Sequence, residues 1–324
     1  MRTKFNPKIR TIHFGNHVVR QRHQRFLFIL AVVVSVTLVY LVGARRATSA
    51  ISTNVNTRPG VSRQKIILDW EAKKWNDVHS KTVFALDVRP LDVFYLSFRG
   101  LSAYYMGMDL PESEERTDLL DETVSSLRKA ITIKGEMPKA QIEYVLGKAY
   151  FAKGDSYFDE AAKYLELSIA FGYIGADSWE YLALAYAGLG KKQQAVKSFD
   201  LALNLSRTDI LLLSAAKAYL EFGQPIKAEA LLLELLASGK DDLAKENGRF
   251  FLGDIYKSRG DLPKAEEQYS LILIKDPSSP EAHYRIGIIF QIMGDSIKAR
   301  AEWRKAIALD PMHAASRQKL TEKL

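Results

Sequence analysis

The distribution of hydrophobic residues divides the chain into three parts. Residues 26–43, FLFILAVVVSVTLVYLVG, form one uncharged apolar run. Residues 44–64 are rich in Ser, Thr, Asn and Arg and poor in large apolar groups, so we expect them to form a flexible linker. From residue 65 to the end, the pattern of hydrophobic and polar positions predicts helices throughout.

The apolar run has the length of a transmembrane helix. Eighteen residues in a helix span roughly 27 Å, which is close to the hydrocarbon thickness of a thin bilayer. A cleaved signal peptide is the alternative, because Thr48-Ser49-Ala50 offers small residues at a suitable place. However, the run exceeds the ~7–15 residues of a signal-peptide core, and Arg45-Arg46 separate it from that site. We therefore expect Phe26–Gly43 to be an uncleaved membrane anchor.

The net charge of +8 is concentrated at the N-terminal end. Residues 1–65 contain 12 basic and no acidic residues, which leaves −4 for residues 66–324. A mildly acidic helical region lacks the basic face of a nucleic-acid binder, so we expect no nucleic-acid partner. Seven basic residues precede the apolar run and five follow it. This favours a cytoplasmic basic segment, residues 1–25, and an exported C-terminal region.

The helical part contains a recurring spacing. An aromatic residue is followed by glycine four positions later, by alanine five positions after that, and by a second aromatic four positions further on. The three sets are Tyr186, Gly190, Ala195 and Phe199; Tyr256, Gly260, Ala265 and Tyr269; and Phe290, Gly294, Ala299 and Trp303.

This spacing resembles the tetratricopeptide repeat, a helix–turn–helix of ~34 residues. Gly253 and Gly287 are 34 residues apart, as the repeat requires. The resemblance covers about 66–324 and implies an all-α solenoid, a right-handed superhelix, preceded by one transmembrane helix. We divide residues 65–324 into a half-repeat at 66–90, repeats that start near 93, 140, 176, 209, 246 and 280, and a C-terminal cap at 312–324. In the last repeat we expect Gly287 to face Ala299 where the two helices meet.

No motif in the chain predicts catalysis. The absence of cysteine excludes thiolate nucleophiles and cysteine-based metal sites. Residues 188–192, GLGKK, lack the first glycine and the Ser or Thr of a phosphate-binding loop, so we interpret them as a turn that follows a helix. We expect no enzymatic activity, no cofactor and no metal.

The candidate functional site is a groove that binds other proteins as helical or peptide segments. In the family that the chain resembles, the first helix of each repeat lines the concave face. We expect an aromatic and aliphatic groove with isolated charges. Carried onto this chain, the lining residues are Phe94, Leu101, Tyr104, Tyr144, Lys148, Phe151, Glu180, Leu184, Leu213, Lys217, Phe250, Asp254, Tyr284, Ile288 and Gln291.

Together these features favour a non-enzymatic scaffold tethered to a bacterial inner membrane, with a periplasmic repeat region that recruits or assembles partners of an envelope complex. Secretion systems and the periplasmic flagellar apparatus are examples that the resemblance suggests. A periplasmic chaperone or quality-control factor for exported proteins is one alternative. A cytoplasm-facing regulator of an envelope enzyme is another, and it requires the opposite topology.

Overall fold

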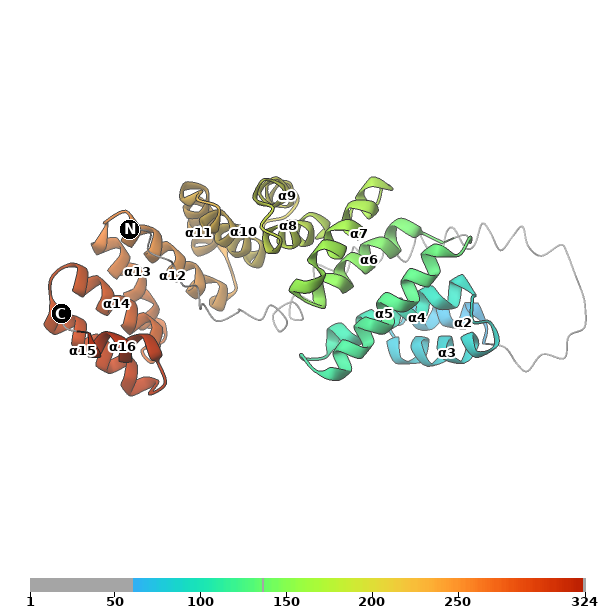
Figure 1. Cartoon of the computed structure of the whole chain (residues 1–324), viewed down its shortest axis with the longest axis horizontal. Helices are drawn as coiled ribbons and strands as arrows, with labels where there is room; N and C mark the ends of the chain where they lie inside the picture. Colours follow the sequence, from blue (N-terminus) through green and yellow to red (C-terminus); the bar gives the residue numbers. More distant parts are fainter. Residues whose placement is uncertain (1–60, 136, 323–324) are drawn as a thin grey trace, which may run out of the picture. The chain divides into compact units, whose positions relative to one another are not determined.

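The computed structural model describes residues 61–135 and 137–322 and is helical throughout that range (Figure 1). These residues form fifteen α-helices and one short 3-10 helix, with no strand among them. The expected all-α fold is therefore confirmed for this part of the chain. The basic segment 1–25, the apolar run 26–43 and residues 44–60 of the linker lie outside the described residues. Among the helices that are described, none combines the length and apolar character needed to cross a membrane.

The chain divides into two compact units, which meet in the sequence between Leu189 and Gly190. The N-terminal unit contains α2 (Arg63–Glu71), α3 (Trp75–Val88), α4 (Val93–Asp109), α5 (Glu114–Thr132), α6 (Lys139–Ala152), the 3-10 helix (Asp155–Tyr157), α7 (Phe158–Ala170) and α8 (Ser178–Gly188). The C-terminal unit contains α9 (Lys192–Leu205), α10 (Asp209–Glu221), α11 (Pro225–Ser238), α12 (Asp242–Ser258), α13 (Leu262–Lys275), α14 (Pro280–Ile292), α15 (Ser296–Leu309) and α16 (Ala314–Thr321).

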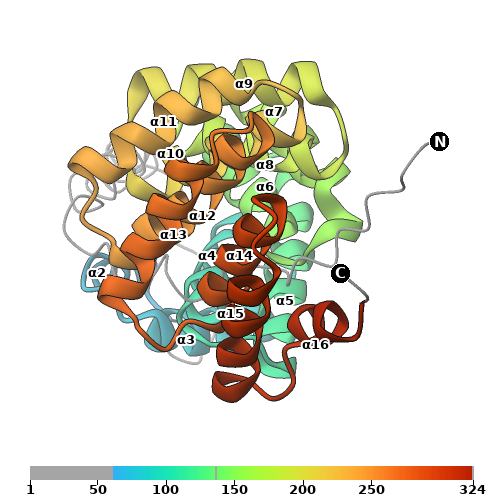
Figure 2. The same cartoon turned by 90° about the vertical axis from the view of Figure 1, so that its left-hand side faces the viewer.

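Within each unit, consecutive helices pack as helical hairpins. The closest pairs are α4–α5 and α6–α7 in the N-terminal unit, and α10–α11, α12–α13 and α14–α15 in the C-terminal unit (Figures 1 and 2). Local sequence signals set the hairpin boundaries. Ser279 accepts a hydrogen bond from the backbone N–H of Ala282 and so caps the start of α14. Gly294, at φ 82°, takes the left-handed conformation that ends this helix and permits the turn into α15.

Glycines inside the first helix of a hairpin make room for a large residue of the second helix. A methyl group added to Gly287 would overlap the indole ring of Trp303, and one added to Gly253 would overlap the ring of Tyr269. Trp303 and Tyr269 are both fully buried. We expected Ala299 to lie opposite Gly287; the atoms nearest to an added methyl group are those of Trp303. The helices do meet at Gly287, but the glycine accommodates the bulky ring four residues after Ala299.

The first described helices also differ from the expected half-repeat. The half-repeat expected at 66–90 implies one helix, over Trp70–Val88, whereas the structure forms two, α2 and α3. The turn between them passes through Lys73, which has a φ of 56°. Trp70 and Trp75, on either side of this turn, pack against each other with ring centroids 4.8 Å apart. Trp75 also stacks on Tyr105 of α4 at 4.7 Å, so the hairpin is fixed to the next helix.

The C-terminal cap forms the short helix α16, which packs beside α15 (Figure 2). His313 begins it and accepts a hydrogen bond from the backbone N–H of Ser316. Arg300 of α15 donates to the carbonyl oxygen of Leu320 at 2.9 Å. A terminal helix of this kind covers the apolar side of the last repeat.

Candidate protein-binding groove

The predicted groove residues lie on the first helix of each hairpin, but they are not equally accessible. Phe94 and Tyr104 of α4 are 2% and 5% exposed. Phe94 packs on Phe98 at 4.6 Å, and Tyr104 packs edge-on against Tyr105 at 5.5 Å. These two aromatic side chains belong to the core of the N-terminal unit and are not groove residues, which corrects the expectation.

The other thirteen predicted residues are half-buried. We call them the groove residues and describe each unit separately. The N-terminal unit holds Leu101 on α4, Tyr144, Lys148 and Phe151 on α6, and Glu180 and Leu184 on α8. The C-terminal unit holds Leu213 and Lys217 on α10, Phe250 and Asp254 on α12, and Tyr284, Ile288 and Gln291 on α14.

Lys148 is the centre of a polar cluster in the N-terminal unit. Its ammonium donates to a carboxylate oxygen of Asp177 at 2.8 Å and to the hydroxyl of Tyr144 at 3.2 Å. It also lies over the ring of Tyr181, 4.6 Å from the centroid. The hydroxyl of Tyr144 in turn donates a hydrogen bond to Asp177. Two groove residues, Lys148 and Tyr144, are thus held by the carboxylate of Asp177, which lies at the start of α8.

The electrostatics keep this cluster charged. Burial disfavours the ammonium of Lys148, but Asp177 and the surrounding tyrosines more than offset that effect, so the pKa of Lys148 is raised well above its ordinary value. Burial and the neighbouring Asp177 carboxylate raise the pKa of Tyr144 well above its ordinary value. At neutral pH, Lys148 is therefore a cation and Tyr144 a neutral donor.

Aromatic rings surround the polar cluster. Tyr144 lies edge-on to Tyr173, with centroids 5.4 Å apart. Phe151 lies edge-on to Tyr181 at 5.2 Å and stacks on Phe158 at 5.1 Å. Phe158 is the first residue of α7, and the 3-10 helix before it lengthens the turn from α6. Sequence reasoning missed Tyr173, Tyr181 and Phe158, because they lie outside the positions that the family pattern assigns to the groove.

Asp254 is the centre of the equivalent cluster in the C-terminal unit. It forms ion pairs with Lys257, at 2.7 Å, and with Arg285. It also accepts a hydrogen bond from the hydroxyl of Tyr269 at 3.0 Å. Arg285 pairs with Glu281 at 2.5 Å, and its guanidinium lies 4.9 Å from the centroid of the Phe250 ring. Each charged side chain of this cluster is therefore paired with an oppositely charged neighbour.

The acid in this cluster is stabilised as a carboxylate. Burial alone would raise the pKa of Asp254, but Arg285 and Lys257 lower it, and the net shift is downward. Burial likewise disfavours the charge of Arg285, and Asp254 and Glu281 reverse the effect, so its pKa is raised. Both partners stay charged at neutral pH.

The two clusters follow the same plan with opposite charges. Lys148 on α6 pairs with Asp177 beside α8, and Asp254 on α12 pairs with Arg285 on α14. In both, a charge from one repeat is neutralised by the next repeat. The expectation of isolated charges is wrong for these residues. What the groove residues then offer a partner is mainly apolar and aromatic surface, including Leu184, Leu213 and Ile288.

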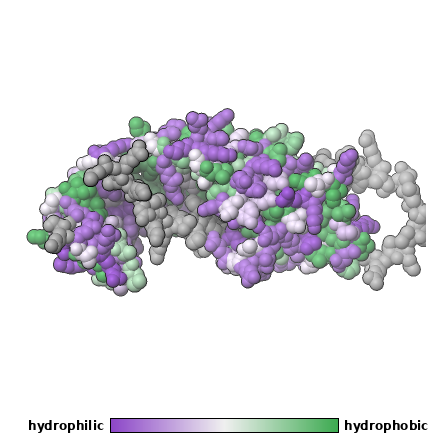
Figure 3. Space-filling model, in the orientation of Figure 1, coloured by the Kyte–Doolittle hydropathy of each residue, from purple (hydrophilic) through white to green (hydrophobic). Residues whose placement is uncertain are grey.

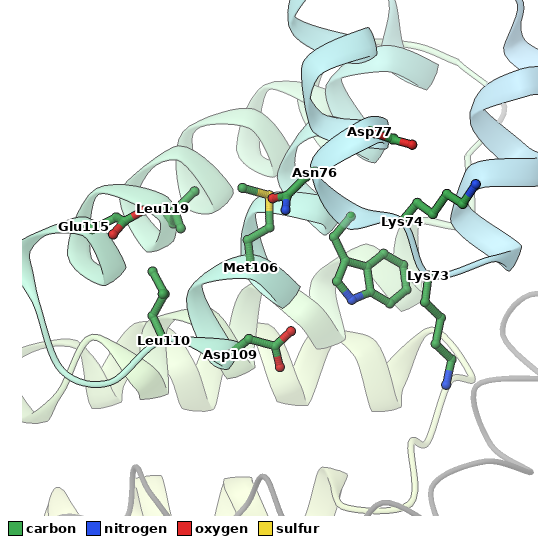
Figure 4. A pocket seen from close by; sticks show the side chains of 10 residues that line it. Lys73, Lys74, Asn76, Asp77, Met106, Asp109, Leu110, Glu115 and Leu119 are labelled. Atoms are coloured by element: carbon green, nitrogen blue, oxygen red, sulfur yellow. The ribbon is translucent and has the colours of Figure 1, made fainter.

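A separate cavity of about 510 Å³ lies where α3 begins, α4 ends and α5 begins (Figure 4). Figure 4 shows Lys73 and Lys74 on one side and Leu110, Glu115 and Leu119 on the other. Its five charged lining residues, which include Asp77 and Asp109, are all exposed. Catalytic sites usually hold buried titratable groups, so this mixed rim does not resemble an active site. Within residues 61–135 and 137–322, no three His, Asp or Glu side chains converge as metal ligands would.

Similar proteins and family models agree with the observed pattern of helical hairpins. A family model described as tetratricopeptide repeat matches residues 144–210 and 213–280, and a second model with the same description matches residues 280–313. Together they cover just over half of the chain. Superkiller complex protein 3 of Mus musculus is 29% identical over 123 residues, which are 36% of this chain and 8% of that protein. The chain therefore matches a small part of this curated relative.

Solved structures show the same fold. The C-terminal part of a repeat-containing protein from Cytophaga hutchinsonii aligns with a TM-score of 0.61 and 14% identity, over 81% of this chain and 100% of that one. A protein from Parabacteroides merdae ATCC 43184 aligns with a TM-score of 0.55 and 16% identity, over 69% of this chain and 85% of that one. Identities this low support the fold alone.

Proposed function

Because the chain belongs to the tetratricopeptide-repeat family, we propose that it is a non-enzymatic scaffold, held at a membrane, that binds segments of other proteins through its groove residues. Proteins of this family serve as protein–protein interaction scaffolds and are generally not enzymes. The observation that carries the proposal for this chain is the neutralisation of its groove charges. Lys148 and Asp254 are both engaged by neighbouring side chains, which leaves aromatic and aliphatic surface for a partner.

The membrane location of the scaffold is part of the proposal. The apolar run Phe26–Gly43 has the length of a membrane span, and the basic residues on its N-terminal side favour a cytoplasmic N-terminus. We place the repeats in the periplasm of a bacterium, where tethering would raise the local concentration of the scaffold beside a membrane-bound complex. Assembly of such an envelope complex is the role that this arrangement supports best.

Site-specific crosslinking tests the groove. A photo-crosslinking amino acid is introduced at Leu184, Leu213 or Ile288, which are half-buried groove residues. The matched controls are Ile226 and Ile297, which are 78% and 85% exposed on helices α11 and α15. We expect the groove positions to capture one common protein in cells and the controls to capture none. Capture from the controls but not from the groove positions would place the binding surface elsewhere.

The topology has its own test. Alkaline phosphatase folds into an active enzyme in the periplasm, so a fusion after Leu324 should be active if the repeats are exported. An inactive fusion, together with an active cytoplasmic reporter at the same position, would assign the repeats to the cytoplasm. The crosslinking experiment would remain valid in that case, because it does not depend on the compartment.

A further inference from the structure

Large apolar side chains are exposed at the start of the N-terminal unit, in the residues before α4. Leu68 of α2 is 58% exposed, Phe84 and Val88 of α3 are 52% and 69% exposed, and Leu91 in the following turn is 67% exposed. We call these four residues the apolar end. Figure 3 shows hydrophobic residues in this region, at the right-hand end of the coloured atoms.

Ion pairs fix the relative position of the two helices that carry the apolar end. Lys81 of α3 pairs with Asp69 of α2, and Arg63 at the start of α2 pairs with Asp92 at 2.8 Å. The two helices are therefore antiparallel, and Asp69, which follows Leu68, lies beside Lys81, one turn before Phe84. Phe84 and Val88 are four residues apart and share one face of α3.

The apolar end is not needed to complete the core. The inner faces of α2 and α3 already bury Ile66, Trp70, Val78 and Leu86 against Phe98 of α4. Apolar surface that a folded unit leaves exposed and that its own core does not need can mark a contact with a partner or a membrane. The position of these residues in the chain favours a membrane over a protein partner.

The chain itself limits how far the apolar end can be from the apolar run. Nineteen residues separate Gly43 from Arg63. In any conformation they span no more than about 70 Å, because a fully extended chain gains at most ~3.6 Å per residue. If Phe26–Gly43 is anchored in a bilayer, α2 and α3 are covalently the nearest described helices to it. A contact with that bilayer is then intramolecular and is favoured by a high effective concentration.

The charge of residues 61–92 indicates whether a membrane contact would be electrostatic or apolar. Residues 61–92 contain six basic and five acidic residues, and Asp69 and Asp92 are engaged by Lys81 and Arg63. The net charge is too small for strong attraction to anionic headgroups. Exposed Phe, Leu and Val side chains favour the boundary between headgroups and acyl chains whatever the headgroup charge.

We propose that the apolar end lies in the lipid interface beside the membrane anchor and so holds the first hairpin of the N-terminal unit against the bilayer. The inference rests on the proposed membrane anchoring. It predicts that Phe84 and Val88 contact lipid in a zwitterionic bilayer as well as in an anionic one. It also predicts that exposed apolar residues of the C-terminal unit do not share this contact.

The cysteine-free sequence permits a direct test in the full-length chain. Val88→Cys, Phe84→Cys and the controls Ile226→Cys and Ile297→Cys are each labelled with an environment-sensitive fluorophore and reconstituted into phosphatidylcholine vesicles, with and without an anionic lipid. A lipid that carries a quencher near its headgroup is then added. Label at residues 84 and 88 should lose most of its emission in both vesicle types, and label at residues 226 and 297 should keep it. Adding Phe84→Asp to the Val88→Cys chain should restore emission, while the melting temperature stays unchanged.

Each outcome has one interpretation. Emission from residues 84 and 88 that matches the controls would overturn the contact, and equal quenching at all four positions would overturn its specificity. Quenching in anionic vesicles alone would show that charge, and not the apolar end, makes the contact. Flotation after an alkaline wash reports the anchor separately. A chain that floats without quenching contradicts this inference alone, whereas a chain that fails to float contradicts the proposed anchoring and, with it, this inference.

Discussion

Gly287 allows a sharp test of how the hairpins pack. The residue lies in α14, and its missing side chain leaves room for the indole of Trp303 from α15. Trp303 is fully buried, and its Nε1 donates to the carbonyl oxygen of Tyr284 at 3.2 Å. In Gly287→Leu, the new side chain and the indole would compete for the same volume. Either the ring moves and loses its hydrogen bond, or the two helices separate.

The size of the effect follows from opposing contributions. Overpacking a filled core typically costs ~1–3 kcal/mol, and the lost hydrogen bond adds about 1 kcal/mol. Leucine is the better helix former and returns up to ~1 kcal/mol relative to glycine. We therefore expect the opening free energy of the α14–α15 hairpin to fall by about 2 kcal/mol, which corresponds to roughly thirtyfold faster amide exchange.

Hydrogen exchange is the appropriate assay, because repeat proteins open locally and one melting temperature averages over several hairpins. Exchange should accelerate across 280–309 in Gly287→Leu. Ala301→Leu places the same new side chain on the exposed side of α15 and should leave exchange there near the wild-type rate. The double variant Gly287→Leu with Trp303→Ala should lose less stability than the sum of the losses in the two single variants, because the leucine then fills part of the space that the indole leaves. Additive effects, or unchanged exchange in Gly287→Leu, would refute this packing.

Three further predictions concern charge and turns. Glu143 of α6 is 1% exposed, one of its carboxylate oxygens has no hydrogen-bond partner, and burial raises its pKa from 4.5 despite Lys139. Its charge therefore costs stability above about pH 4.5. Glu143→Gln should raise the free energy of unfolding by about 1 kcal/mol or more at pH 7, and this gain should disappear below pH 4.5. The control Glu71→Gln, at an exposed position, should give no such gain. Lys148→Met should lower the free energy of unfolding by about 2 kcal/mol, because it leaves the half-buried Asp177 without its cation. Lys217→Met is the control, since its partner Glu221 is 3.9 Å away, and it should lower the free energy of unfolding by less than ~1 kcal/mol. Chemical denaturation measures both. Gly294→Val should destabilise the last hairpin by ~1 kcal/mol or more by the same exchange measurement, because valine rarely adopts a φ of 82°.

The spacing of small and aromatic residues was sufficient to predict the hairpins of the last two repeats. Gly260 and Gly294 end their helices with positive φ values, and each turn lies where the aromatic–glycine spacing predicts it. The turn at Lys73 could not be predicted in this way. The sequence Ala72-Lys73-Lys74 contains no Gly, Pro, Asn or Asp, so the hydrophobic pattern on both sides reads as one continuous helix. Tertiary packing of Trp70 and Trp75 on α4 stabilises this turn instead.

The groove residues were predictable as helix positions but not as interacting side chains. A family pattern places Lys148 and Asp254 on the first helix of a hairpin, where both are found. It does not specify that each will reach a residue about thirty positions later, because those pairings depend on side-chain length and on the distance between adjacent repeats. The same limit explains Glu143. It stands four residues before Gly147, as Trp179 stands four before Ala183, so the pattern assigns it to the core without providing a partner for its charge.

The inter-repeat ion pairs determine how mutations of the groove must be interpreted. Lys148 and Arg285 are charged and lie beside the groove residues. Charged residues in such places are usual first choices for mutations that search for partner contacts. Here each holds a carboxylate of an adjacent repeat, so its loss would weaken the alignment of neighbouring first helices before it removed any contact with a partner. Reduced partner capture by Lys148→Met would therefore not identify a binding residue unless stability were unchanged. Leu184, Leu213 and Ile288 are better probes, because they are half-buried and apolar and no such ion pair depends on them.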